Sequence, residues 1–369
     1  MLSDSIDQPS DGALRGLHRR RFIQAVFGAG AATFLAGRFA NAGASQGKAA
    51  TGPRVMTVRG WISARDMGAT LAHEHMLANF QTYQEWASHP LAYDRDEVVK
   101  VVLPHLLRLH TLGCRTFVDA TAAYLGRDPV LLRRLSEKSG LHVLTVTGNY
   151  AADDYKHLPP YVYTLSAEAL AQRWIDEWIR GIDGTGIRPG FIKLGFNGGP
   201  LSEVEQKLIH AGAIAHLKTG LTIGAHTGPA VSAFEQLAVL EKEGVHPSAW
   251  IWIHAQNEKD PARHIEAARR GAWVEFDGIG PETLALHVTL VTRMRDEGLL
   301  DHVLISQDAG WYRVGRPGGG TFRSYETVFT DFVPALRAKG FSVSQIDTLL
   351  VRNPAKAFAI STRGAAGHG

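Results

Sequence analysis

From residue 54 onward, the chain alternates short apolar runs with amphipathic stretches, and this alternation constrains its fold more than any other feature. Continuous apolar runs of this length are typical of parallel strands that are buried on both faces. Eight such runs predict strands at residues 69–73, 115–120, 142–148, 190–195, 221–226, 250–254, 272–277 and 302–307. A short hairpin is predicted at 55–62, ahead of the first of these strands.

Between these runs, apolar residues recur three and four positions apart, which predicts helices packed against the strands. The predicted helices span residues 95–112, 128–139, 167–180, 202–218, 230–243 and 261–270. Eight strand-then-helix units in one domain predict an α/β fold, a (β/α)8 TIM barrel with a short N-terminal β-hairpin, over residues 54–361. A flavodoxin-like sheet is the alternative fold, but it normally needs fewer strands.

Composition places the chain among ordinary globular proteins. Apolar residues make up 45% of the 369 residues and charged residues 20%, so a buried core is expected. The formal net charge of +3 gives no reason to expect nucleic acid or an anionic membrane as a partner. The single cysteine, Cys114, excludes an intramolecular disulfide and is interpreted as a small core residue.

The first 42 residues have the pattern of an export signal. Arg19, Arg20 and Arg21 precede an apolar run at 25–36, and small residues follow that could be cleaved. The paired arginines predict a twin-arginine-type signal peptide over 1–42, and therefore a periplasmic or secreted protein exported by the Tat route. Residues 43–53 are predicted to be a linker and 362–369 a flexible tail. An uncleaved arm or a membrane anchor is the alternative reading, and no stable membrane span is expected in the mature form.

Polar residues stand at the ends of the predicted strands, where the active sites of such barrels collect. Alternate side chains of an extended strand share a face, so His73 and His75 can point at one metal ion. Lys193 lies in an apolar strand, where an unpaired ammonium group is costly. One histidine at a strand end is more often structural, but the joint pattern predicts a metal centre. Its candidate ligands are His73, His75, Lys193, His226, His254 and Asp308.

The chain resembles the phosphotriesterase-like family of the amidohydrolase superfamily, which includes lactonases and esterases. The segment 68–76 around His73-Glu74-His75 is similar to that family's opening motif, and 125–128 to the stretch after its second strand. Residues 352–358 resemble its closing helix. The resemblance covers about residues 54 to 361.

The resemblance implies a role for each candidate. His73, His75 and Asp308 would hold the more buried of two divalent metal ions, and His226 and His254 the more exposed one. Lys193 would carry a carbamate that bridges both ions. The metal is expected to be Zn, although Mn, Co or Fe fits the same ligands. A hydroxide between the two ions would attack the substrate, with Asp308 accepting its proton. A homodimer is also implied.

The substrate is less constrained by the sequence. Tyr150 is a candidate catalytic and substrate-binding residue, and Trp86, Tyr312 and Trp311 are further candidate substrate contacts. The loop that contains Trp311 and Tyr312 is long and rich in glycine, which is typical either of a mobile lid or of an ordinary surface loop. Gly278 stands where related lactonases have Arg. Aromatic and apolar lining favours an uncharged small-molecule ester or lactone, with promiscuous phosphotriester hydrolysis.

Three alternatives remain at this stage. The chain could be an organophosphate triesterase, a catalytically inactive metal-holding periplasmic binding protein, or a mononuclear deaminase or amidase on the same barrel. The binding protein would keep the metal ligands but hydrolyse nothing, and the mononuclear enzyme would not require a carbamate at Lys193.

Overall fold

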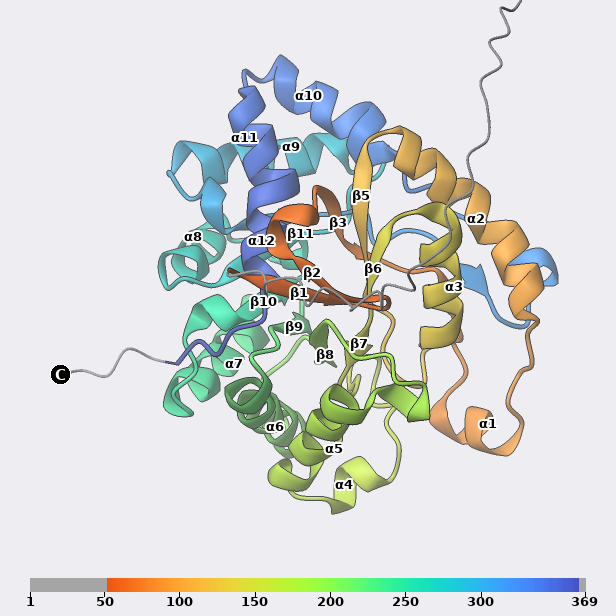
Figure 1. The fold of residues 1–369 in the computed structure, drawn as a ribbon. Coiled ribbons are helices and arrows are strands. Elements are labelled where there is room, and N and C mark those ends of the chain that lie inside the picture. Colours follow the sequence, from red (N-terminus) through yellow and green to blue (C-terminus); the bar gives the residue numbers. More distant parts are fainter. Residues whose placement is uncertain (1–51, 365–369) are drawn as a thin grey trace, which may run out of the picture. The chain divides into compact units, whose positions relative to one another are not determined.

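A computed structural model of the protein describes residues 52–364. In this part of the chain a ring of helices surrounds a central set of parallel strands (Figure 1), so the predicted TIM barrel is confirmed. The barrel strands are β3 (Ala69–Glu74), β5 (Cys114–Asp119), β6 (His142–Leu144), β7 (Val146–Thr147), β8 (Phe191–Gly195), β9 (Ile223–His226), β10 (Trp250–Ile253), β11 (Trp273–Phe276) and β12 (Val303–Ile305). The predicted signal peptide and most of the predicted linker lie outside the described residues.

The strands form two hydrogen-bonded sheets that join into one barrel. One sheet has the order β3-β5-β6 and the other runs from β7 through β8, β9, β10 and β11 to β12. Only Thr145 separates β6 from β7, so these two pieces form one interrupted strand. On the opposite side, the His73 N–H donates to Ser306 Oγ over 2.9 Å, and the Asp308 N–H donates to the His73 carbonyl over 3.1 Å. These contacts close the barrel between β3 and the residues after β12.

The helices follow the strands in alternation and cover the outside of the barrel. They are α2 (Arg95–Thr111), α3 (Pro129–Ser139), α5 (Ala167–Arg180), α6 (Glu203–Thr219), α7 (Ala230–Lys242), α8 (Pro261–Arg269) and α9 (Leu284–Asp296), followed by α10 (Val333–Ala338), α11 (Val343–Asp347) and α12 (Asn353–Ala357). Ser202 and Glu205 form a complete capping box at the start of α6, because each side chain accepts from the other's backbone N–H. Helices α1 (Tyr83–Ser88), α4 (Tyr161–Thr164), α9, α10 and α11 were not predicted.

The N-terminal hairpin covers one end of the barrel. Strands β1 (Arg54–Thr57) and β2 (Gly60–Ser63) pair antiparallel and lie across the barrel strands in Figure 1. The Val58 N–H donates to the Val143 carbonyl near the start of β6, over 2.8 Å. Val55 packs into the same buried cluster as Phe191 in the barrel interior. The hairpin therefore closes the amino-terminal end of the barrel and leaves the carboxyl ends of the strands free for a site.

The last described residues correct one prediction. Residues 362–364 were assigned to a flexible tail, but Arg363 is docked on the barrel. Its guanidinium donates to Thr222 Oγ1 over 2.9 Å, to the Ser248 carbonyl over 3.0 Å and to the Ala359 carbonyl over 2.6 Å. Gly364 forms a bridge with Val245. Five guanidinium donors can satisfy many carbonyl groups at once, which explains why this short segment is ordered.

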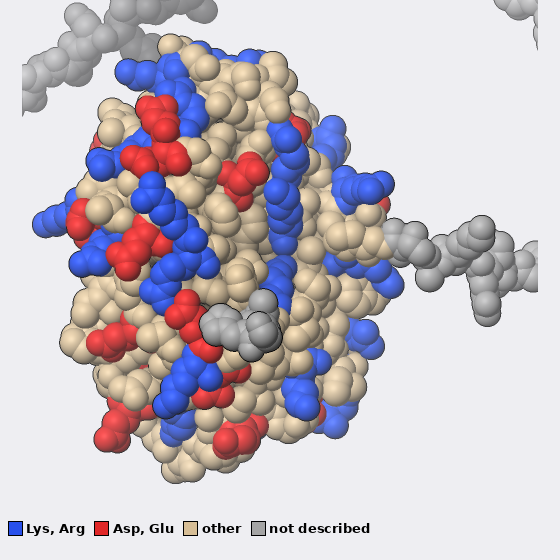
Figure 2. Space-filling model, turned by 90° about the vertical axis from the view of Figure 1, so that its left-hand side faces the viewer, with Lys and Arg blue, Asp and Glu red and all other residues tan. Residues whose placement is uncertain are grey.

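No helix within residues 52–364 is long and apolar enough to cross a membrane. On the face over α7 and α8, basic side chains alternate with acidic ones (Figure 2), as in the pairs Arg269–Glu297 and Arg270–Glu241. The same view also shows a row of Lys and Arg side chains that runs down the middle of this face. Cys114 is fully buried, as predicted for a core residue.

Candidate metal centre

All six predicted metal ligands line a single cavity of about 150 Å³ at the carboxyl ends of the strands. They come from β3 and the residue that follows it, from β8 and β9, from the residue directly after β10, and from the loop after β12. They are His73, His75, Lys193, His226, His254 and Asp308. Residues separated by more than 230 positions thus meet because parallel strands of a barrel end at the same rim.

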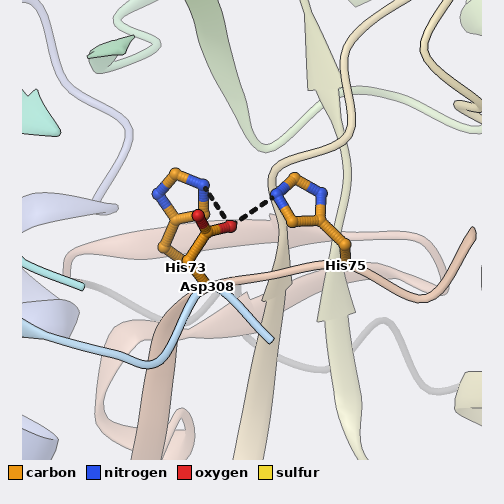
Figure 3. Close-up of side chains that lie close together, drawn as sticks. All are labelled: His73, His75 and Asp308. Atoms are coloured by element: carbon orange, nitrogen blue, oxygen red, sulfur yellow. Dashed lines mark ion pairs between the residues drawn. The ribbon is translucent and has the colours of Figure 1, made fainter. Parts of the chain in front are cut away.

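The first half of the centre is built by β3 and the loop after β12. His75 Nε2 lies 3.0 Å and His73 Nε2 3.7 Å from the same oxygen, Oδ1 of Asp308 (Figure 3). The outer nitrogen of His75 lies 2.7 Å from Thr121 Oγ1. Burial alone would raise the pKa of the Asp308 carboxyl. The neighbouring His75 and His73 have the opposite effect and hold this pKa below its usual range. This group offers two imidazole nitrogens and one carboxylate oxygen to one cation.

The second half lies on β9 and directly after β10. His254 Nε2 is 2.8 Å from His226 Nδ1, and the two rings are nearly perpendicular. The pKa of His226 is lowered well below its usual value by burial and by the nearby His254 and Lys193, so the ring is neutral and can donate a lone pair. His254 has a left-handed backbone, with φ of 62°, which turns its side chain at the strand end.

Lys193 lies in the middle of β8 and is almost completely buried. Its Nζ is 3.3 Å from His73 Nε2, so an ammonium group here would face a candidate metal ligand. Burial lowers the pKa of Lys193 to about 8, although the nearby acidic groups, Glu275 first, oppose this effect. The amine is therefore unusually easy to deprotonate. Close packing at Gly148, where a Cβ would lie 2.2 Å from the Lys193 carbonyl oxygen, holds β7 against this part of β8.

The buried carboxylate of Asp277, directly after β11, supports the candidate ligands, and this role was not predicted from the sequence. Asp277 Oδ1 accepts the Nδ1–H of His254 over 2.6 Å, while its Oδ2 lies 3.3 Å from His73 Nδ1. Asp277 is fully buried, and burial alone would raise the pKa of its carboxyl group. The neighbouring His254 and His73 have the opposite effect and hold this pKa well below its usual range. Such contacts fix the ring orientation, so the Nε2 atoms of both histidines face the cavity. Glu275 lies 4.0 Å from the same His73 atom.

The aromatic candidates divide between two places. Tyr150 and Trp311 line the cavity, with the Tyr150 hydroxyl 3.0 Å from His226 Nδ1. Burial, together with the charges of Asp308 and Asp153, raises the pKa of Tyr150, which keeps its hydroxyl protonated. Gly195 leaves room for the Tyr150 ring, because a Cβ there would lie 2.5 Å from it. Tyr150 can therefore donate a hydrogen bond towards the site.

Tyr312 and Trp86 lie elsewhere, contrary to the prediction that both contact substrate in this cavity. Tyr312 is buried and donates to Glu97 Oε1 of α2 over 2.8 Å. It belongs to β13 (Tyr312–Arg313), which pairs in parallel with β4 (Leu77–Ala78) and so anchors the start of the loop that was considered as a lid. Trp86, on α1, packs against Tyr83 and Tyr124 and lines a separate, larger cavity.

The donor set fits divalent metal ions. Imidazole nitrogens and a carboxylate oxygen are ligands for Zn and neighbouring first-row metals. The ligand atoms of His73, His75 and Asp308 all lie within 4.8 Å of one another, as atoms around one cation must. The outer nitrogens of three of the four imidazoles face a hydroxyl or a carboxylate, the arrangement that metal-ligating histidines usually have.

Comparison with known proteins identifies the family. Residues 53–358 match the model of the phosphotriesterase family. The chain belongs to the phosphotriesterase family. It is 31% identical over 298 residues to the phosphotriesterase homology protein of Escherichia coli K12, covering 79% of this chain and 98% of that one. It is 27% identical to human N-acetyltaurine hydrolase, covering 82% of this chain and 96% of the relative.

A solved structure agrees with this assignment. A mutant of the organophosphorus hydrolase from Deinococcus radiodurans superimposes with a TM-score of 0.76 at 29% identity, covering 83% of this chain and 98% of that one. The alignments thus span almost the whole length of the matched proteins. They confirm the resemblance to the phosphotriesterase family that was noted in the sequence. The protein is a hydrolase of this family.

Proposed function

We propose that the protein is a binuclear metal-dependent hydrolase that cleaves a carboxylic ester or a lactone. The observation that carries this proposal is the convergence of four imidazoles, one carboxylate and one buried lysine on a single cavity. His73, His75 and Asp308 would hold one divalent cation, and His226 and His254 the other. Lys193, as a carbamate, would supply one oxygen to each cation. Zn suits this ligand set, as do Mn, Co and Fe.

The carbamate resolves a chemical conflict at Lys193. A buried ammonium group 3.3 Å from the His73 nitrogen has no lone pair to offer and repels a cation. Loss of a proton from the ammonium group gives the neutral amine, which would add carbon dioxide and release a second proton; the resulting carbamate would be negatively charged and would offer two oxygen ligands. The lowered pKa of Lys193, about 8, makes the neutral amine accessible at ordinary pH.

Two side chains of the cavity are suited to the chemical step. When bound, the two cations would lower the pKa of water and stabilise negative charge on the substrate oxygen. Asp308, kept ionised by its histidine neighbours, would accept the proton of the attacking water and deliver it to the leaving group. The protonated Tyr150 hydroxyl would donate a hydrogen bond to the substrate and so orient it.

The cavity favours a neutral substrate. Its lining includes apolar groups from Phe80, Leu125 and Trp311. Among residues 52–364, Lys193 is the only lysine or arginine that lines the cavity, so this part of the chain places no further lysine or arginine there to pair with an anionic substrate. An ester or lactone presents a polarised carbonyl oxygen without a net charge. A phosphotriester is also neutral, and the named activity of the Deinococcus relative favours organophosphate hydrolysis as a second activity of the same site.

A substrate panel tests the proposal. Zinc-, manganese- and cobalt-reconstituted protein would be assayed with lactones, aryl esters, phosphotriesters and N-acyl amides. We expect hydrolysis of at least one lactone or ester, its loss in Lys193→Ala and Asp308→Asn, and its retention in Lys242→Ala, which changes an exposed lysine of α7. Protein that holds two metal ions but hydrolyses no compound would support the metal-holding binding protein instead. Cleavage of amides alone would contradict the proposed ester or lactone activity and would show that the protein is an amide hydrolase.

We also propose export by the Tat route to the periplasm or medium, on the basis of the arginine-rich segment at residues 18–24 and the apolar run that follows it. Cell fractionation compares the full chain with a double variant, Arg20→Lys and Arg21→Lys. The proposal expects the variant to accumulate inside the cell, and equal distribution of both proteins would contradict it.

A further inference from the structure

A second cavity, larger than the one at the candidate metal centre, has a volume of about 550 Å³. Its walls come mainly from α1, from the segment after β5 and from α5. None of its lining residues also lines the cavity of the six candidate metal ligands. Ligand pockets typically enclose roughly 300–1,000 Å³, so this cavity has the size of a site for a small molecule.

The charged side chains of this second cavity are paired with one another, apart from one arginine. Arg127 donates to both carboxylate oxygens of Glu177, over 2.8 and 2.9 Å, and lies 3.5 Å from Asp183 Oδ2. Arg180 forms an ion pair with Asp176, which precedes it by one turn of α5. These pairs use all three acidic side chains of the lining and two of its three arginines. A cationic ligand would therefore find its carboxylates already occupied.

The remaining arginine is Arg173, an exposed residue of α5. Its guanidinium carbon lies 4.2 Å from the centre of the Tyr161 ring, so the cation is stacked on an aromatic face. Within residues 52–364, the structure shows no carboxylate or other hydrogen-bond acceptor for this guanidinium. Arg173 therefore keeps its donors for solvent or for an anionic ligand.

Aromatic rings form the wall beside this arginine. The rings of Tyr124 and Trp86 meet edge to face, with their centroids 5.0 Å apart. Burial and the nearby Tyr161 raise the pKa of Tyr124, so its hydroxyl group stays protonated and uncharged. Tyr124 also has a left-handed backbone, with φ of 66°. Such a backbone is strained for a residue with a side chain, and strained residues of this kind are concentrated at ligand sites.

A buried amide fixes the position of two further rings in the lining. Asn149 is 1% exposed, and its Oδ1 accepts the indole N–H of Trp174 over 3.2 Å. Its Nδ2 donates to the hydroxyl oxygen of Tyr161 over 3.1 Å. Trp174 and Tyr161 are thus held in place before any ligand binds, which reduces the entropy that binding would cost.

We propose that this second cavity binds a small aromatic carboxylate, whose carboxylate group pairs with Arg173 and whose ring packs against Trp86 and Tyr124. A carboxylate matches the fork of a guanidinium group with two parallel hydrogen bonds. One unpaired guanidinium suits one negative charge, and a flat ring makes edge-to-face or stacked contacts with the aromatic wall. The site is separate from the proposed hydrolysis, so its test requires no turnover.

Three probes separate the contribution of the charge from that of the ring. They are 2-naphthoate, the neutral 2-naphthalenemethanol, and acetate, which lacks the ring. Calorimetry measures their binding to the full chain, before and after reconstitution with zinc. We expect 2-naphthoate to bind roughly tenfold or more tightly than either other probe. Its affinity should be the same with and without zinc, because the two cavities share no lining residue.

Two variants test the two contacts, and both change exposed side chains. Arg173→Gln should bring the affinity for 2-naphthoate to within about threefold of that for the alcohol, whose own binding should not change. Trp86→Ala should weaken the binding of both ring compounds by roughly three- to tenfold. The control is Arg337→Gln, which alters an exposed arginine of α10 and should leave all three affinities unchanged.

Three results would overturn the proposal. One is the absence of 2-naphthoate binding, as expected if a second copy of the chain covers the cavity. Another is binding that occurs only after zinc is added, which would place the ligand at the metal centre. The third is a preference for 2-naphthoate over the alcohol that survives in Arg173→Gln.

Discussion

The carboxylate of Glu74 accepts hydrogen bonds from the backbone N–H groups on both sides of Asp308. Glu74 Oε1 lies 2.9 Å from the Gln307 nitrogen, and Oε2 lies 2.7 Å from the Ala309 nitrogen. The Ser306 hydroxyl also donates to Oε1 over 2.7 Å. Burial raises the pKa of Glu74 to about 8, and these donors offset part of that effect. Glu74 therefore positions the loop that carries Asp308, without facing the cavity itself.

Glu74→Ala should remove this support. Two buried backbone N–H groups would lose their acceptor, at a cost of about 3 kcal/mol in the free energy of unfolding. Asp308 would lose its fixed position, so the metal content after dialysis should fall. Urea unfolding and elemental analysis measure both effects, with Glu74→Gln as the milder control that keeps one acceptor oxygen. Full metal retention in Glu74→Ala would refute this role.

Asp277→Ala should weaken metal binding without touching a ligand. The Nδ1 atoms of His254 and His73 would lose the carboxylate that orients them. Supporting contacts of this kind typically contribute about 10- to 100-fold to metal affinity. Competition with a chromogenic chelator measures the dissociation constants, and Asp296→Asn, which alters an exposed residue of α9, serves as the control. An unchanged metal affinity in Asp277→Ala would show that His254 and His73 do not need this carboxylate to hold their orientation.

Carboxylation of the metal-free protein should depend on pH. Only the neutral amine of Lys193 reacts with carbon dioxide, and its pKa is lowered to about 8 by burial. The neutral fraction grows as the pH rises through that value. At constant dissolved carbon dioxide, the initial rate should rise roughly tenfold from pH 6 to pH 7 and level off above about pH 9. The ¹³C NMR signal of the carbamate measures this rate. A rate that still rises tenfold between pH 9 and pH 10 would indicate an ordinary lysine pKa.

Arg363 should contribute to the free energy of unfolding but not to the rate of catalysis. Its guanidinium satisfies carbonyl groups at the amino-terminal end of the barrel, far along the strands from the metal centre. Arg363→Ala should lower the free energy of unfolding by about 2 kcal/mol, since several buried acceptors lose a donor. The kcat of the folded, metal-loaded enzyme should not change. Denaturant titration and steady-state kinetics test the two expectations, and a large fall in kcat would contradict them.

The barrel and the meeting of the six candidate ligands in one cavity were predictable because both depend on local sequence patterns. Each barrel strand is a buried apolar run, and each candidate ligand lies within such a run, as Lys193 does, or at or after its end, as His226 and His254 do. The amphipathic segment of α9 carries the same kind of signal in Val288, Val291 and Met294, and could have been found.

Other features depend on contacts between distant segments. Asp277 could be noticed in the sequence, but its role needs His254 and His73 brought to it by two other strands. The pairing of β4 with β13 involves two residues on each side, which is too short for any periodicity. That pairing turns Tyr312 away from the cavity and towards α2. No local sequence pattern predicts this orientation of Tyr312.

The most direct test of the central claim is a crystal structure of the zinc-reconstituted protein, with anomalous diffraction measured at the zinc edge. The account predicts two zinc ions in the cavity, one on His73, His75 and Asp308 and one on His226 and His254, with a carboxylated Lys193 bound to both. A single ion, or a Lys193 side chain that ends in a free amine beside two ions, would contradict it.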